Sequence, residues 1–216
     1  MPTGAPNERR ATARRSILKN FTNTVRKSID WFLIANGAAD PDFVAIGNPE
    51  LIGKRTHRTV PLPPGGTLAD YVPFYFTPKA PMLLNIKTGH NGIKQRPDQD
   101  IVILISSCRA MRDCGVAMLF TDRHAYTATA AWTARADDLS GMIDWDILCR
   151  HDFARDDRYP DKMERYQAEA LAHRHVPVRA LLGIGCASDV VKSSIEGQMR
   201  AAGLALEAFV RPGWYF

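Results

Sequence analysis

Continuous apolar runs and periodic apolar positions mark the clearest elements in the second half of the chain. The run Ile101–Ser106 lies between charged and turn-forming residues, which predicts a strand buried on both faces. Val178–Gly185 predicts a second buried strand. Ser188–Ala202 repeats apolar residues at helical spacing and is followed by Gly203, a residue type that commonly ends helices. Leu206–Arg211 then predicts a final strand.

Weaker patterns predict the remaining elements. Residues 8–35 favour a helix with a break near residues 20–23, and a short helical turn is expected near Pro49–Lys54. Met163–Ala172 shows both helical and strand character. The other predictions are extended segments at Tyr71–Phe76 and Met82–Ile86, helices at Ser107–Cys114 and Leu139–Cys149, and strands at Val116–Thr121 and Ala125–Thr133.

The order of these elements indicates the fold class. Strands and helices do not alternate as β-α-β units, and neither GxGxxG nor GxxxxGK[ST] opens a helix, which argues against a Rossmann or P-loop nucleotide site. An α+β fold with mostly antiparallel sheets fits better. No repeat or linker divides the sequence, so residues 1–216 are expected to form a single domain.

Composition is typical of a soluble globular protein, with 45% hydrophobic and 24% charged residues. No apolar run approaches the roughly 18–20 residues that a membrane span requires. The N-terminus lacks the apolar stretch of a secretory signal. The four cysteines form no CxxC pair and have no histidines at zinc spacing. We therefore expect a cytoplasmic protein with reduced thiols, no metal and no membrane association.

Much of the net charge of +5 lies at the N-terminus. Residues 1–27 contain seven lysines and arginines but a single acidic residue, Glu8. Residues 1–19 are expected to form a basic arm. It is either a solvated, disordered tail or an electrostatic arm that binds a polyanion through phosphate contacts and counterion release. The charge alone does not separate these alternatives.

Aromatic residues and prolines are concentrated in residues 65–83, which read Gly-Gly-Thr-Leu-Ala-Asp-Tyr-Val-Pro-Phe-Tyr-Phe-Thr-Pro-Lys-Ala-Pro-Met-Leu. The steps Thr77-Pro78 and Ala80-Pro81 push the preceding residues away from the α region. A rigid segment of this kind suits the wall of a ligand cleft better than a generic core strand. If residues 71–76 are extended, alternation places two sets of side chains on opposite faces. One set is Val72, Phe74 and Phe76, and the other is Tyr71, Pro73 and Tyr75.

This block resembles the signature of the DarT family, toxin ADP-ribosyltransferases that use NAD to modify bases of single-stranded DNA. Two later motifs fit the same family in the same order, namely Phe120-Thr121-Asp122-Arg123-His124 and Arg165-Tyr166-Gln167-Ala168-Glu169-Ala170-Leu171. The similarity extends from around residue 36 to the C-terminus. It implies the split β-sandwich of ADP-ribosyltransferases, in which NAD lies in the cleft between two small sheets.

The chemistry of such a site needs a carboxylate and a cation. Release of nicotinamide passes through an oxocarbenium-like state, which a carboxylate stabilises, while arginine suits the diphosphate. The resemblance implies that Glu169 is the catalytic glutamate, Arg55 the active-site arginine and His124 the cleft histidine. Arg58 would replace Arg55 under a small shift of register. The ordinary alternatives are a glutamate on a helix surface, a solvated basic cluster and a turn histidine. We expect Glu169→Ala to abolish transfer and leave the fold intact, because an exposed cleft carboxylate contributes little to packing.

The resemblance also implies contacts with NAD. Besides Arg55, the residues expected near the cofactor are Asn20, Thr22, Asn36, Tyr75 and Met82. Family members usually carry a His-x-Thr-His segment before a short helix, whereas this chain reads Asn20-Phe21-Thr22-Asn23. Asparagine replaces some hydrogen bonds of imidazole but cannot take a proton. This departure puts NAD affinity in question.

The densely charged segment Arg150–Lys162 precedes Glu169. In this enzyme class, the loop before the catalytic glutamate selects the acceptor. Basic side chains suit a DNA backbone, and an aromatic ring can stack on a base. The residues expected to contact DNA are Arg155, Arg158, Tyr159 and Lys162. The alternative is an ordinary solvated loop.

Two functions therefore remain open. The first is an NAD-dependent mono-ADP-ribosyltransferase that modifies thymine, in preference to guanine, in single-stranded DNA. It implies a monomeric toxin whose DarG-like macrodomain antitoxin removes the mark. The second is a catalytically weakened relative that binds single-stranded nucleic acid and has an impaired NAD site. The set Arg55, His124 and Glu169 favours the first function, and the missing histidines favour the second.

Overall fold

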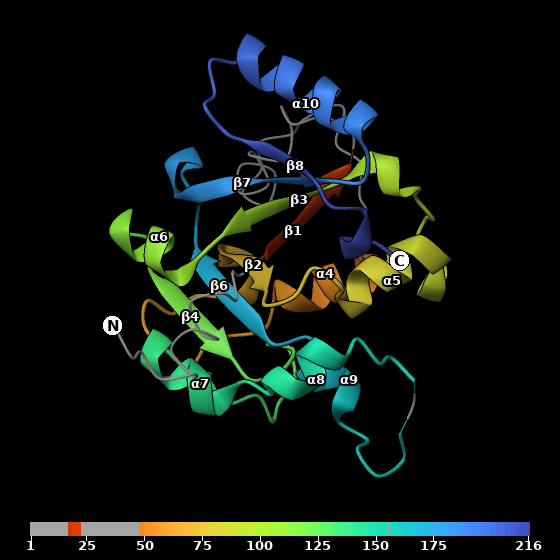
Figure 1. The fold of residues 1–216 in the computed structure, drawn as a ribbon. Helices are drawn as coiled ribbons and strands as arrows, with labels where there is room; N and C mark the ends of the chain where they lie inside the picture. The colour runs from red at the N-terminus through yellow and green to blue at the C-terminus, as the bar shows by residue number, and fades with distance from the viewer. Residues whose placement is uncertain (1–16, 23–47, 155) are drawn as a thin grey trace, which may run out of the picture.

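The computed structural model describes residues 17–22, 48–154 and 156–216 (Figure 1). Within these ranges, one sheet contains strands in the order β5-β4-β6-β2-β1-β3-β7-β8. The strands are β1 Ile17–Thr22, β2 Tyr71–Tyr75, β3 Ile101–Ser106, β4 Met118–Thr121, β5 Trp132–Thr133, β6 Glu169–His173, β7 Leu181–Cys186 and β8 Ala208–Val210.

Short helices surround this sheet. In Figure 1, α10 lies beside β7 and β8, whereas α7, α8 and α9 lie at the opposite end near β4 and β6. The α-helices in the described ranges are α4 Pro49–Arg55, α5 Pro81–Thr88, α6 Cys108–Asp113, α7 Leu139–Met142, α8 Trp145–Arg150, α9 Lys162–Arg165 and α10 Asp189–Ala201. None of these helices has both the length and the apolar character that spanning a membrane requires.

Strand β1 joins two half-sheets. It pairs antiparallel with β2, where Ile17 lies opposite Tyr75, and with β3, where Ile17 lies opposite Ile105. One half contains β5, β4, β6 and β2, the other contains β3, β7 and β8, and their strand directions diverge in Figure 1. Only the β7–β8 pairing is parallel among the described strands. The expected α+β architecture of two small, mostly antiparallel sheets is confirmed.

Strand β2 separates two hydrophobic clusters. Val72, Phe74 and Phe76 pack into the largest hydrophobic cluster of the described residues. Tyr71, on the other face of the strand, packs in a separate cluster that includes Leu68. The predicted alternation is therefore confirmed for these three side chains and Tyr71, and β2 is buried on both faces.

A third cluster attaches helix α5 to the second half-sheet. Leu83 of α5 packs with Ile101 and Ile103 of β3. The hydroxyl of Tyr215 lies 3.0 Å from the carbonyl oxygens of Ile101 and Gly185. These contacts hold the C-terminal segment against β3 and β7.

The extended segment expected at Met82–Ile86 is wrong, because these residues lie within α5. Pro81 occupies the start of the helix, where its missing N–H removes no intrahelical hydrogen bond. Gly89 ends the helix with a φ of 72°, a conformation that glycine adopts without strain. The same proline that disfavours helix before it therefore begins a helix after it.

The helix expected over residues 8–35 is wrong where the structure describes this segment, since Ile17–Thr22 form strand β1. Pairing with β2 and β3 supplies hydrogen bonds on both edges of the strand. Such tertiary pairing outweighs local propensity, which is a weak guide for short segments. The rest of the predicted helix lies outside the described residues.

Several other predictions need smaller corrections. Only Trp132–Thr133 of the predicted strand Ala125–Thr133 pair with β4. The predicted helix Leu139–Cys149 is divided because Ile143 has an extended backbone and Asp144 caps a new helix. The predictions confirmed to within a residue are the turn at Pro49–Lys54, the extended segment Tyr71–Phe76, the strand Ile101–Ser106, and the helices Ser107–Cys114 and Ser188–Ala202.

Two glycine substitutions should have opposite effects on stability. In Gly183→Ala, the added Cβ would lie 2.5 Å from a ring carbon of Phe209 and 2.9 Å from the carbonyl oxygen of Glu207. Such overpacking should lower the free energy of unfolding by about 1–3 kcal/mol. Gly197→Ala within α10 meets no neighbouring atom within 4 Å and should raise it by about 0.5–1 kcal/mol. Urea unfolding measures both, and effects of the same sign would contradict the close approach of β7 and β8.

Candidate active site

Glu169 is the first residue of β6, and its side chain is 0% exposed. Strand β6 lies between β2 and β4, and Glu169 is opposite Tyr75 of β2. Because Tyr75 is in turn opposite Ile17, one rung of the sheet runs from Glu169 to the strand that joins the halves. The sequence-based alternatives of a helix-surface glutamate and an exposed carboxylate are therefore wrong. A buried carboxylate needs charged or hydrogen-bonding partners, and these determine what it can do.

Helix α4 supplies the charged partner. The side chain of Asn48 caps this helix by accepting hydrogen bonds from the N–H groups of Glu50 and Leu51. Arg55, the last residue of the helix, donates from Nη1 to both carboxylate oxygens of Glu169, at 3.2 and 3.1 Å. Charge-assisted hydrogen bonds of this kind offset the cost of burying the carboxylate.

Arg58 does not take this position. Its Nη2 lies 3.4 Å from the carbonyl oxygen of Thr127, so the geometry selects Arg55 as the partner of Glu169. Among the described residues, Arg55 Nη2 and Arg58 Nε are buried N–H donors without a hydrogen-bond partner. Leaving a buried donor unsatisfied costs about 1–3 kcal/mol. Both arginines therefore retain donors that suit an anionic ligand such as a diphosphate.

His124 also lies near the carboxylate. Its backbone N–H donates to the carbonyl oxygen of Glu164 at 3.1 Å. Its ring Nδ1 accepts a hydrogen bond from the N–H of Tyr126 at 3.1 Å, so the neutral imidazole carries its proton on Nε2. Nε2 lies 3.8 Å from Glu169 Oε1. His124 is therefore held by one contact of its backbone and one of its ring, with the ring Nε2–H near the carboxylate.

Burial lowers the pKa of His124 below its ordinary value of 6.5. The negative charge of Glu169 opposes this shift, and the positive charge of Arg55 reinforces it. Burial is the largest cause because it disfavours the imidazolium form. His124 is therefore neutral near pH 7 and acts as a hydrogen-bond donor beside Glu169.

Thr121 and Tyr75 also lie beside Glu169. Thr121 Oγ1 accepts a hydrogen bond from the backbone N–H of Glu169 at 3.3 Å and donates to the carbonyl oxygen of Arg123 at 2.7 Å. Burial, followed by the charge of Glu169, raises the pKa of the Tyr75 hydroxyl, which therefore stays protonated. Sequence reasoning placed Thr121 in a motif but gave it no role, because a threonine on a strand usually only packs.

The other predicted cofactor contacts are spread more widely. Met82 lies at the start of α5 and packs, partly buried, against the cluster around Leu83. Asn20 and Thr22 belong to β1, but the structure describes only the backbone of this strand. Asn36 lies outside the described residues. The structure therefore brings together Arg55, His124, Glu169 and Tyr75 from the predicted set.

The charged loop before Glu169 has two different parts. Arg158 is exposed and forms an ion pair with Asp156 at 3.1 Å, and Tyr159 is 53% exposed. Lys162 is only 7% exposed, because its Nζ contacts Asp152 Oδ2 at 2.5 Å and the carbonyl oxygen of Ala154 at 2.9 Å. The prediction of an exposed Lys162 is therefore wrong, and the lysine holds the loop together. Arg155 lies outside the described residues.

The described residues contain no group of three or more His, Cys, Asp or Glu side chains arranged to hold a metal ion. The described site presents a carboxylate, a guanidinium and an imidazole. A carboxylate held between these two groups is suited to stabilise a developing positive charge.

Comparison with known proteins identifies the family of this chain. A family model described as "ssDNA thymidine ADP-ribosyltransferase, DarT" matches residues 17–216. The chain belongs to the DarT family. A DNA ADP-ribosyl transferase from Escherichia coli O127:H6 (strain E2348/69 / EPEC) is 49% identical over 177 residues, which cover 81% of this chain and 80% of that protein.

Two solved DarT structures from Thermus sp. 2.9 resemble this protein. The complex with ADP-ribosylated ssDNA has a TM-score of 0.80 and 26% identity, and the match covers 94% of this chain and 96% of that chain. The complex with NAD+ has a TM-score of 0.74 and 26% identity, and the match covers 94% and 98% of the two chains. As a member of the DarT family, this protein is a DNA ADP-ribosyltransferase, and the cluster around Glu169 lies within the matched residues.

Removal of the Glu169 charge should destabilise the fold. Glu169→Gln leaves the guanidinium of Arg55 without its counter-charge, and breaking a buried pair costs about 3–5 kcal/mol. The matched control Glu196→Gln, at the exposed pair with Lys192, should change the free energy of unfolding by less than about 0.5 kcal/mol. Urea unfolding compares them. Combining Glu169→Gln with Arg55→Met should recover part of the loss, and equal stability of Glu169→Gln and the control would contradict the pairing.

The titration of His124 should show that burial outweighs the attraction of Glu169. An NMR titration of the imidazole should give a pKa below 6.5, and Glu169→Gln should lower it further by removing the opposing charge. The pKa of His124 is lower in the folded protein than in the unfolded chain, so the unfolded chain takes up a proton at a higher pH. Protonation of His124 should therefore lower the free energy of unfolding as the pH falls below 6.5. A pKa above 6.5 would instead mean that His124 and Glu169 form an ion pair.

Proposed function

We propose that this protein transfers ADP-ribose from NAD to a ring nitrogen of thymine in single-stranded DNA and releases nicotinamide. The observation that carries the proposal is the buried carboxylate of Glu169, held by both oxygens on Arg55 with the Nε2 of His124 at 3.8 Å. The family membership and the relatives' complexes with NAD+ and ADP-ribosylated ssDNA support it.

Glu169 suits the central step of this reaction. As the bond between ribose C1′ and nicotinamide breaks, its electron pair leaves with nicotinamide and positive charge develops on the sugar. A fixed carboxylate stabilises that charge without reorganising. The thymine nitrogen then forms the new bond to C1′, and its proton passes to the Glu169 carboxylate. Arg55 keeps this carboxylate oriented before the substrate arrives.

Arg55 has a second task in this proposal. One nitrogen, Nη1, orients Glu169, while Nη2 is buried without an acceptor among the described residues and can bind the anionic part of NAD. Tyr75 lies opposite Glu169 in the sheet, and we propose that it contacts the reacting sugar. Asn20, Thr22, Asn36 and Met82 complete the proposed cofactor contacts, on the strength of the family resemblance.

The acceptor strand would lie along the loop before Glu169. Tyr159 offers an exposed ring for stacking on a base, and Arg158 and Arg155 are the cations proposed for the DNA backbone. Lys162 supports this loop from inside. Neutral His124 would donate its Nε2 hydrogen bond to the substrate.

The proposed biological role follows from the family. We propose that the protein is a monomeric toxin that acts by modifying thymine in DNA. Its partner would be a DarG-like macrodomain antitoxin that removes the ADP-ribose. The second reading, a binding protein with an impaired NAD site, rests on the asparagines at positions 20 and 23 and becomes an outcome of the test below.

Transfer itself tests the proposal. Wild-type protein with labelled NAD should modify a thymine-containing single-stranded oligonucleotide but not one in which guanine replaces thymine. Glu169→Gln should lower the rate by about 10²–10³-fold, as for other preorganised electrostatic groups, and Glu196→Gln should leave it unchanged. The folded state of each variant is checked by circular dichroism at a temperature where Glu169→Gln remains native.

Three results would change the conclusion. Modification of guanine alone would contradict the thymine assignment. Oligonucleotide binding without product would favour the binding-protein reading and a lost NAD site. Equal rates for wild type and Glu169→Gln would contradict the role of the carboxylate.

A further inference from the structure

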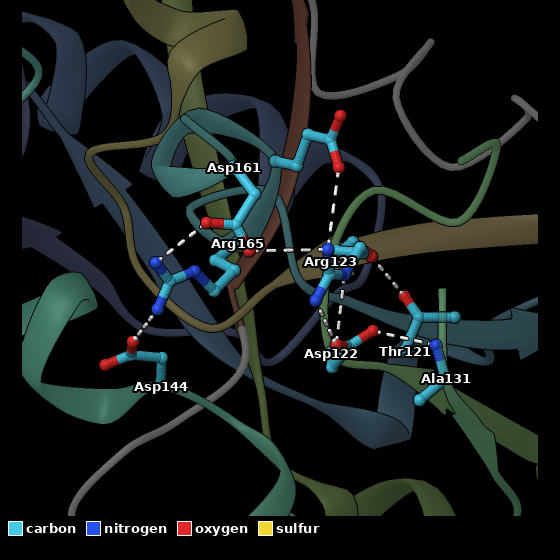
Figure 2. A network of polar contacts seen from close by, with 8 residues as sticks. Thr121, Asp122, Arg123, Ala131, Asp144, Asp161 and Arg165 are labelled. Carbon is cyan, nitrogen blue, oxygen red and sulfur yellow. Dashed lines mark hydrogen bonds and ion pairs between the residues drawn. The ribbon is translucent and has the colours of Figure 1, made fainter. Parts of the chain in front are cut away.

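Asp161 connects two arginines that come from different parts of the active site (Figure 2). Its Oδ1 accepts a hydrogen bond from Arg165 Nη2 at 2.9 Å, and its Oδ2 lies 3.5 Å from Arg123 Nη1. Arg165 also donates from Nη1 to Asp144 Oδ2 at 2.6 Å, which ties it to the start of α8. One carboxylate therefore links the loop before Glu169 to the segment that follows β4.

The Arg123 end of this bridge adjoins the catalytic histidine. Arg123 immediately precedes His124 and donates from Nε to Asp122 Oδ2 at 3.0 Å. Asp122 Oδ1 accepts from the backbone N–H of Ala131 at 2.8 Å, which closes the loop that contains His124. Movement of Arg123 would therefore move the histidine and its loop together.

The Arg165 end of the bridge supports the tip of the acceptor loop. The guanidinium carbon of Arg165 lies 5.8 Å from the ring centroid of Tyr159, within the range of a cation–π contact. The backbone of Tyr159 is also held, because its N–H donates to Asp156 and its carbonyl oxygen accepts from Lys162. The exposed ring of Tyr159 is thus presented in a defined place.

The carboxylates around Arg123 and Arg165 distinguish these two arginines from cations that bind a ligand. Arg123 and Arg165 contact four carboxylates, those of Asp122, Asp144, Asp161 and Glu164. This excess of negative charge repels phosphate, so neither guanidinium suits a DNA backbone. Arg165 Nε is buried without a partner among the described residues, which costs stability and argues against a purely stabilising role.

We propose that Asp161 and Arg165 are positioning residues that fix Tyr159 relative to His124 and thereby orient the acceptor base. The inference rests on the proposed function. Transfer of ADP-ribose to a base requires the nitrogen of the base to lie in line with ribose C1′, and small misplacements of the reacting groups lower the rate. The bridge formed by Asp161 and Arg165 connects the ring of Tyr159 to the loop of His124. It would set the alignment of the base without contacting NAD.

The test measures separately how a substitution changes use of the acceptor DNA and binding of NAD. Asp161→Asn and Arg165→Lys should raise KM for a thymine-containing oligonucleotide or lower kcat so that kcat/KM falls about 10- to 100-fold. The dissociation constant for NAD, measured by calorimetry, should change by less than about twofold, because the proposal assigns both residues to positioning of the acceptor alone. The matched control is Arg109→Lys, whose exposed pair with Asp113 on α6 has the same four-residue spacing. This control should resemble wild type.

A double variant distinguishes positioning from simple loss of structure. If Arg165 acts through Tyr159, Arg165→Lys should have little further effect on kcat/KM once Tyr159→Leu has removed the ring. Additive losses, or an NAD dissociation constant that rises in parallel with the loss of transfer, would overturn the proposal. So would wild-type kcat/KM in both Asp161→Asn and Arg165→Lys.

The inference and the proposed function fail in different ways. Absence of product from wild-type protein would contradict the proposed function itself. Active wild type with unaffected bridge variants would contradict only the positioning role. If a bridge variant is less stable, its kinetics are measured at a temperature where its circular dichroism matches that of wild type, so that the acceptor effect is read on folded protein.

Discussion

The burial of the Glu169 carboxylate is the constraint on which the active site depends. A carboxylate with no exposed surface is tolerated only when other groups compensate its charge, and here Arg55 contacts both oxygens. Thr121 holds the backbone of the same residue, and His124 places its Nε2 nearby. The contacts that make the buried charge acceptable are thus the contacts that would orient it for catalysis. Stability and chemistry therefore involve the same side chains.

The sheet explains why these groups meet. Glu169, Tyr75 and Ile17 lie opposite one another on β6, β2 and β1, so the carboxylate sits in the rung that leads to the strand joining the two half-sheets. Helix α4 brings Arg55 to this rung, and the end of β4 brings His124. The site therefore lies near the junction of the half-sheets, where the family resemblance predicts that NAD binds.

The arginines near the site fall into two electrostatic classes. Arg55 and Arg58 retain buried donors without partners among the described residues, which leaves them able to bind an anion. Arg165 also has a buried Nε without such a partner, but both Arg165 and Arg123 are surrounded by carboxylates, whose negative charge disfavours an anion there. A sequence count of basic residues near a predicted site cannot make this distinction, because it depends on which carboxylates the fold brings within reach.

The sequence by itself determined the strongly patterned elements and the family motifs. The strand Ile101–Ser106 and the helix Ser188–Ala202 follow from local periodicity, and the motif around Glu169 named the central carboxylate. Tertiary structure decided the rest. Strand β1 exists because two neighbours pair with it, and Arg55 rather than Arg58 meets Glu169 because α4 ends in that direction. These outcomes depend on contacts between segments far apart in the chain, which local patterns do not encode.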